Sequence, residues 1–195
     1  GKLGADVYWS LDVATGELTI SGSGDMDKDV YVAPLYLVKD LIKKASIENG
    51  ITSIGMFVFL ECYNLTEVSI PESVTYIGVS AFSECSGLTK INIPESVTVI
   101  GNGAFYSCNI ITASFPAATF IDTQAFYRCY NLKSLYLMGS SICKLSNSGA
   151  FTSTPIGGYS ASTGTYGSIY VPASLLTSYQ TATNWTYFSS RFVGI

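Results

Sequence analysis

The chain has 195 residues, 48% of them hydrophobic and 12% charged. This composition can bury a hydrophobic core and argues against disorder, and no apolar run reaches the roughly 18 residues that a membrane-spanning helix needs. The formal net charge of −4 leaves no basic surface for phosphate contacts, so we expect no binding to nucleic acid.

The chain contains no histidine. This absence excludes Ser-His and Cys-His nucleophilic pairs and removes most zinc and iron sites. Catalysis by carboxylate, lysine or tyrosine side chains stays open. We therefore expect a protein that is not an enzyme and that needs no cofactor, with a carboxylate- or lysine-based enzyme as a lower-ranked alternative.

The head of the chain carries the first predicted element. In the segment VYWSLDVATGELTISGSGDM, Val7 to Met26, apolar residues alternate on either side of Ala14-Thr15-Gly16. Alternation predicts strands, and the residues between them predict a turn. We expect a β-hairpin here, as part of an N-terminal β cap over residues 1–44.

A pattern of about 23 residues then repeats over residues 45–172. The segment SIPESVTYIGVSAFSEC, which begins at Ser69, returns as NIPESVTVIGNGAFYSC, which begins at Asn92. The phenylalanines and cysteines keep this step at Phe59, Phe82 and Phe105 and at Cys62, Cys85 and Cys108, and a shorter copy ends at Cys129. A period of about 20–50 residues is typical of a solenoid, in which each repeat forms one coil.

Within one coil the residues predict two short extended segments and a turn. Lys90 to Ile93 alternate polar and apolar side chains, as in a half-buried strand, and Pro94 ends it. Val97 and Ile100 begin a second inward-facing segment. We expect Gly101 at a corner with positive φ, followed by a tight helical turn that points Ala104, Phe105 and Cys108 inward.

The cysteines at the repeated position should form a column inside the core. Neighbouring coils roughly 5 Å apart would allow disulfides by Cα spacing, but parallel Cβ vectors disfavour them. We therefore predict buried, reduced thiols that pack as small hydrophobic groups. A metal cluster is not expected, because the column members lie one coil apart. The column consists of Cys62, Cys85, Cys108 and Cys129, and Cys143 lies outside it.

Aligning the predicted strands gives two rows of outward side chains. The first row holds Ser46, Ser69, Asn92, Ser114, Tyr136 and Tyr170, and the second holds Lys44, Glu67, Lys90, Thr112, Ser134 and Ser168. Most residues of both rows can be explained as ordinary polar side chains on a solvent-exposed sheet face. The two tyrosines, which lie close to a Gly-rich loop with Tyr159 and Tyr166, indicate recognition. Our candidate ligand-binding residues are Tyr136, Tyr170, Asn92, Ser69, Glu67 and Lys90.

The repeat pattern I-P-x-S-V-T-x-I-G-x-x-A-F-x-x-C-x-x-L resembles the BspA-type leucine-rich repeats of cell-surface proteins from gut and oral bacteria. The resemblance covers residues 45–172, with an irregular segment over 138–168. Residues 7–26 are similar to the family's W-x-L…G-x-L-T-I-S-G-x-G-x-M cap. The tail VPASLLTSYQTATNWTYFSS resembles its closing helix, so residues 173–195 are expected to form a C-terminal cap.

The resemblance implies a right-handed leucine-rich-repeat solenoid. A parallel β-sheet would form one side, short helices or turns the other, and a β-hairpin and a helical segment would cap the two ends. It also implies a monomeric, non-catalytic recognition or adhesion module, extracellular or on the cell surface after loss of a signal peptide. Such a module would bind a host protein or a glycan through the outward sheet face. A purely structural spacer in a larger surface protein is the alternative.

Overall fold

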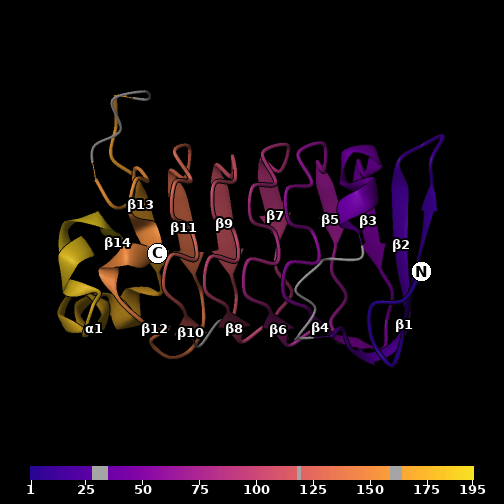
Figure 1. Ribbon diagram of the computed structural model, residues 1–195. Helices are drawn as coiled ribbons and strands as arrows, with labels where there is room; N and C mark the ends of the chain where they lie inside the picture. The colour runs from indigo at the N-terminus through magenta and orange to yellow at the C-terminus, as the bar shows by residue number, and fades with distance from the viewer. Residues whose placement is uncertain (28–34, 118–119, 159–163) are drawn as a thin grey trace.

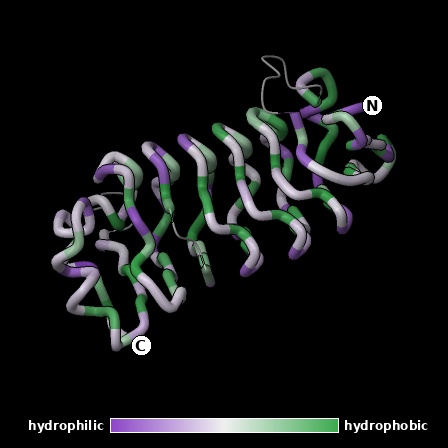
Figure 2. Tube along the Cα trace, turned by 90° about the horizontal axis from the view of Figure 1, so that it is seen from below, coloured by the Kyte–Doolittle hydropathy of each residue, from purple (hydrophilic) through white to green (hydrophobic). Residues whose placement is uncertain are grey.

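The fold is a stack of coils between two caps, seen in a computed structural model that describes residues 1–27, 35–117, 120–158 and 164–195. Figure 1 shows that each coil contributes one strand to an upper row, which we call the front row, and one strand to a lower row, which we call the back row. In Figure 2, hydrophobic stretches recur at matching places in successive coils. This arrangement confirms the predicted leucine-rich-repeat solenoid. No helix in the described residues is long and apolar enough to cross a membrane.

The N-terminal cap is the predicted hairpin. Strand β1 (Asp6–Asp12) pairs antiparallel with β2 (Glu17–Asp25). The turn between them closes at Gly16, whose φ of 79° suits glycine. Because β2 is long, it pairs with the first front strand near its start and with the first back strand near its end. One strand therefore begins both rows.

The front row is parallel and keeps the predicted register. Its strands are β3 (Lys44–Ile47), β5 (Glu67–Ser69), β7 (Lys90–Asn92), β9 (Thr112–Phe115), β11 (Ser134–Leu137) and β13 (Ser168–Val171).

The front row is divided between two of its strands. Strands β5 and β7 lie side by side but do not pair, so β5 ends one hydrogen-bonded sheet and β7 begins another. The expectation of one continuous front sheet is therefore wrong at this boundary, and Ser69 and Asn92 fall in different sheets.

The back row is also parallel, and through β2 it belongs to the same sheet as β3 and β5. It contains β4 (Ile51–Ile54), β6 (Tyr76–Ile77), β8 (Val99–Ile100), β10 (Phe120–Ile121) and β12 (Lys144–Leu145). Gly101, just after β8, does not have the positive φ that we predicted. A Cβ there would lie 2.9 Å from the Ile77 carbonyl oxygen, so glycine is required by the close approach of the previous coil.

The side opposite the front strands carries turns and short helices, as predicted: turns follow β4, β6, β8 and β10, and the 3₁₀ segment η2 (Ser148–Phe151) follows β12. Ser80 and Gln124 have φ of 50° and 58°, a left-handed conformation that cannot continue a right-handed helix. Backbone N–H groups in these turns instead donate to carbonyl groups of the next coil. The Phe82 N–H, for example, donates to the Ala104 carbonyl at 2.8 Å. The other described 3₁₀ segments lie in or next to the caps, beginning with η1 (Tyr36–Leu41).

The core contains a column of stacked phenylalanine rings. Successive centroids are 4.9, 5.4, 5.3 and 5.6 Å apart, along Phe59, Phe82, Phe105, Phe126 and Phe151. Each ring is fully buried. Because each inner ring of the column stacks on rings of the coils before and after it, the column ties the repeats into one core.

The predicted cysteine column is confirmed. All five cysteines are free and buried. The Cys85 thiol donates to the Phe59 carbonyl of the previous coil at 3.0 Å, and Cys108 and Cys129 repeat this contact one and two coils later. In the irregular coil, the cysteine position is taken by Thr154, which the sequence reading missed.

The C-terminal cap covers the last coil with aromatic residues. It consists of η3 (Ala173–Leu175), α1 (Leu176–Thr181), η4 (Thr186–Arg191) and β14 (Phe192–Gly194). Trp185 lies 6.0 Å from the Phe151 ring and ends the phenylalanine column. The helical cap was predicted, but the added strand β14, which pairs with β13, was not.

Candidate recognition surface

The outward rows of the front strands form the candidate surface, which we call the front face. Backbone register places Ser46 beside Ser69 in one sheet, and it places Asn92, Ser114, Tyr136 and Tyr170 on successive strands of the other. The second row follows in the same way, with Lys44 beside Glu67 and with Lys90 leading to Thr112, Ser134 and Ser168. The predicted rows are therefore correct within each sheet.

The N-terminal end of the front face carries alternating charges. The Lys44 ammonium lies 3.0 Å from the Glu67 carboxylate, and both side chains are more than half exposed. The hydrogen bond to Glu67 raises the pKa of Lys44, and Glu17 adds to this effect. An exposed pair of this kind contributes little to stability. The sequence reading missed Glu17, which β2 places beside Lys44.

Two shallow grooves lie over this charged half. One has a volume of about 260 Å³ and is lined by residues of β2, β3 and β5, including Glu17, Thr19 and Ser46. The other has a volume of about 480 Å³ and lies over the boundary between β5 and β7. It is lined by Thr66, Glu67, Val68, Ser69, Ile70, Lys90 and Asn92. The structure thus brings four of the six predicted site residues together in one groove.

The other two predicted residues form a ring stack. The Tyr136 and Tyr170 ring centroids are 4.5 Å apart, with 12° between the ring planes, and both side chains are half-buried. Stacking covers one face of each ring. The free face of Tyr136 is on the side of β9, where the row residue is the small Ser114. The tyrosines therefore form a wall at the end of a row of small polar side chains.

The C-terminal cap extends this aromatic end. Val193 on β14 lies beside Tyr170 and is 39% exposed. The Arg191 guanidinium lies 3.6 Å from the centroid of the Tyr166 ring, a cation–π contact. The sequence analysis missed Val193 because it did not predict β14, and it also missed Arg191 at the end of η4. The other loop tyrosine that we singled out, Tyr159, lies outside the described residues.

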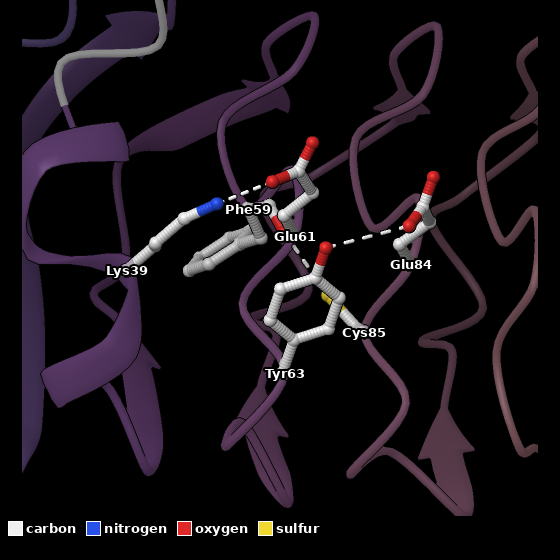
Figure 3. A network of polar contacts seen from close by, with 6 residues as sticks. All are labelled: Lys39, Phe59, Glu61, Tyr63, Glu84 and Cys85. Carbon is white, nitrogen blue, oxygen red and sulfur yellow. Dashed lines mark hydrogen bonds and ion pairs between the residues drawn. The ribbon is translucent and has the colours of Figure 1, made fainter.

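A second polar cluster lies on the turns between back and front strands (Figure 3). The Lys39 ammonium pairs with the Glu61 carboxylate, which raises the pKa of Lys39. It also lies over the rings of Tyr36 and Tyr63, at 4.1 and 5.3 Å from their centroids. These contacts join η1 to the first coil, so the cluster serves to attach the N-terminal cap.

The thiols do not have the properties of nucleophiles. Burial raises the pKa of Cys62, Cys129 and Cys143 to about 12, and it raises the pKa of Cys85 and Cys108 well above the ordinary value. A thiol reacts as its thiolate, so these groups are inert at neutral pH. Within the described residues, no group of three or more His, Cys, Asp and Glu side chains could hold a metal ion.

Comparison with known proteins identifies the repeats. A family model described as the BspA type leucine rich repeat region matches residues 40–163 in six copies. No curated protein sequence matches the chain.

Two solved structures share the fold. A leucine-rich repeat protein from Eubacterium ventriosum is 21% identical over 88% of this chain and 65% of its own, with a TM-score of 0.58. The Treponema pallidum leucine rich repeat protein is 22% identical over 70% of this chain and 72% of its own, with a TM-score of 0.52. The chain thus spans less than two thirds of the Eubacterium protein.

Proposed function

The chain belongs to the BspA-type leucine-rich-repeat family, and we propose that it is a non-catalytic recognition module that binds a host protein or a glycan at the front face, outside the bacterial cell. The observation that carries the proposal is the Tyr136–Tyr170 wall beside Ser114. A free ring face above small polar residues offers both apolar area and hydrogen-bonding groups to a ligand.

The geometry of the front face favours a ligand that lies across several strands. The small row residues Ser69, Asn92 and Ser114 leave space, while Tyr136 limits it at one end. Tyrosine ranks among the residues that contribute most to binding, because it buries a large area at low cost in side-chain entropy. We place the main binding energy at Tyr136 for this reason.

The chemistry of the described residues favours recognition over catalysis. The thiols stay protonated because burial raises their pKa, and the chain has no histidine to act as a general base. The charged side chains of the front face are exposed, and Lys44 and Glu67 form an ordinary surface pair. These features suit contacts with a partner more than proton transfer.

The test combines a ligand screen with variants of the wall. The protein is screened against extracellular matrix proteins and on a glycan array, and each hit is measured with the double variant Tyr136→Ala and Tyr170→Ala. Loss of a buried aromatic contact should weaken binding by about ten-fold or more. The matched control is Tyr136→Phe with Tyr170→Phe, which keeps the ring stack and should keep most of the affinity.

Stability measurements separate binding from folding. Removal of the ring stack should cost about 0.5–1.5 kcal/mol, which lowers the thermal midpoint by only a few degrees in a chain of this size. Unfolding at a much lower temperature would make the tyrosines structural. Unchanged binding by the double variant would place recognition elsewhere, and the absence of any ligand would favour the spacer.

A further inference from the structure

The division of the front row creates a polar groove at the middle of the front face. At three other boundaries, the residue before a front strand donates its N–H to the previous coil. Thr66 donates to Lys43, Ile111 to Thr89 and Lys133 to Ile111, at 2.8, 3.0 and 2.9 Å. In the described structure, Thr89 makes no such bond to Thr66, although both residues lie beside the boundary of β5 and β7. The Thr89 N–H and the Thr66 carbonyl are therefore not bonded to each other here.

The groove also contains a lysine that the fold does not use. Lys90 is exposed and, among the described residues, makes no ion pair. Glu67, across the groove, is held by Lys44 at 3.0 Å, so its negative charge is partly balanced. The hydroxyl of Ser69 and the amide of Asn92 line the same groove. An ammonium beside hydroxyl and amide groups fits a ligand that carries both a carboxylate and hydroxyls.

We propose that the groove over β5 and β7 binds the carboxylate-bearing residue of an acidic glycan, with Lys90 as its cationic contact; the inference rests on the proposed function of the front face. The row from Asn92 through Ser114 to Tyr136 crosses two strand spacings, about 10 Å. A short oligosaccharide can therefore place its acidic residue at Lys90 while a second residue lies against the free face of Tyr136.

The lining favours a carbohydrate over a peptide. Peptide recognition depends on apolar or aromatic anchors that fill fully desolvated pockets. This groove is shallow, and its side chains are mostly hydroxyl, amide and charged groups, with Val68 almost fully buried beneath them. Sugar hydroxyls both donate and accept hydrogen bonds, so they can use these side chains together.

The experiment compares acidic and neutral forms of the same sugar by calorimetry with the intact chain. One pair of probes is a uronate-containing tetrasaccharide and its carboxyl-reduced form. The other is sialyllactose and lactose, which distinguishes sialic acid from uronic acid as the source of the carboxylate. For at least one pair, the acidic form should bind about ten-fold more tightly, as expected for one charge-assisted hydrogen bond.

Variants assign this preference to one side chain. Lys90→Ala should remove the roughly ten-fold preference for the acidic form over the neutral form, while Lys90→Arg should keep the preference. The control Lys144→Ala changes the net charge equally on the back row, where β12 lies, and should have no effect. Raising the salt concentration from about 0.05 to about 0.5 M should reduce the preference of the wild type.

The outcomes separate this inference from the proposed function. Equal binding of acidic and neutral probes, binding of neither acidic probe, or an unchanged preference in Lys90→Ala would each overturn the inference. If a protein or neutral glycan still binds through the tyrosines, the proposed recognition function is retained and only the acidic-glycan inference is lost. If an acidic glycan binds through Lys90 and the tyrosine double variant has no effect, the groove is the site and the tyrosine wall is not.

Discussion

In three successive coils, a cysteine thiol donates to the carbonyl of the phenylalanine one coil earlier, at 3.0 Å in each case. Cysteine suits this position because it fills a small apolar space and still has a weak donor for a buried carbonyl. Thr154 fills the equivalent place in the irregular coil, but its hydroxyl donates at 2.7 Å to the carbonyl of Phe151 in the same coil. In these four coils the position thus holds a small side chain with a hydrogen-bond donor, although the acceptor of Thr154 lies in a different coil from those of the cysteines.

The raised thiol pKa values predict how the cysteines react. At about pH 9 an exposed cysteine is largely thiolate, whereas Cys129, with a pKa raised to about 12, stays protonated. We expect a thiol reagent to label none of the five cysteines in the native protein at this pH, and all five in denaturant. Mass spectrometry after a short pulse of reagent measures both states. Rapid native labelling of Cys62, Cys85, Cys108 or Cys129 would contradict the buried column.

At the scale of the elements, the phenylalanine column predicts large effects of single substitutions. Phe82 and Phe105 are fully buried and stack on a ring in each neighbouring coil. Replacing either with alanine leaves a cavity between coils and should lower the free energy of unfolding by about 3–5 kcal/mol. Chemical denaturation measures the loss. The exposed Lys90→Ala serves as control and should change stability by no more than about 0.5 kcal/mol.

The C-terminal cap is attached through the backbone of Cys143. Its N–H donates to the Tyr179 hydroxyl at 2.8 Å, and its carbonyl accepts from the Trp185 indole at 2.6 Å. Tyr179→Phe keeps the ring but leaves a buried N–H without an acceptor, which should cost about 1–3 kcal/mol. Tyr187→Phe makes the same chemical change at a side chain that is 74% exposed and should be neutral. Equal stability of the two variants would show that the hydroxyl contact is not important.

Elements that depend on side-chain patterns were predictable, and those that depend on backbone conformation were not. Alternation from Lys90 to Ile93 predicted a front strand, and the spacing of Phe and Cys predicted the core columns. The turns were expected to be helical because nothing in the side chain of Ser80 or Gln124 indicates a positive φ. That conformation is imposed by hydrogen bonds to the next coil, which a single repeat does not reveal.

The part of the candidate site that follows the repeat was predictable from sequence, and the part that comes from the caps was not. Register between identical repeats places Tyr136 beside Tyr170 from spacing alone, and the structure brings their rings into a stack. Glu17, Arg191 and Val193 were missed because they come from the two caps, whose strands do not follow the repeat. The interruption between β5 and β7 also has no sequence signal, since both coils carry the full repeat pattern.

At the scale of the whole molecule, the solenoid has a continuous back row and a divided front row. In the back row β6 pairs with β8, at the same coil boundary where β5 and β7 of the front row do not pair. Repeat proteins are stabilised mainly by contacts between neighbouring coils. At this boundary the two coils are therefore held together by the back strands, the turns and the phenylalanine column. The front strands add no paired hydrogen bonds there.

Hydrogen exchange tests this division directly. The amides of Thr66, Ile111 and Lys133 each donate to the previous coil, whereas in the described structure Thr89 has no such bond to Thr66. All four residues are exposed at the same point of their coils, so they form a matched set. Because exchange requires a broken hydrogen bond, we expect the Thr89 amide to exchange fastest of the four, by NMR or by fragment mass spectrometry. Equal protection of the four amides would mean that the front row is continuous in solution.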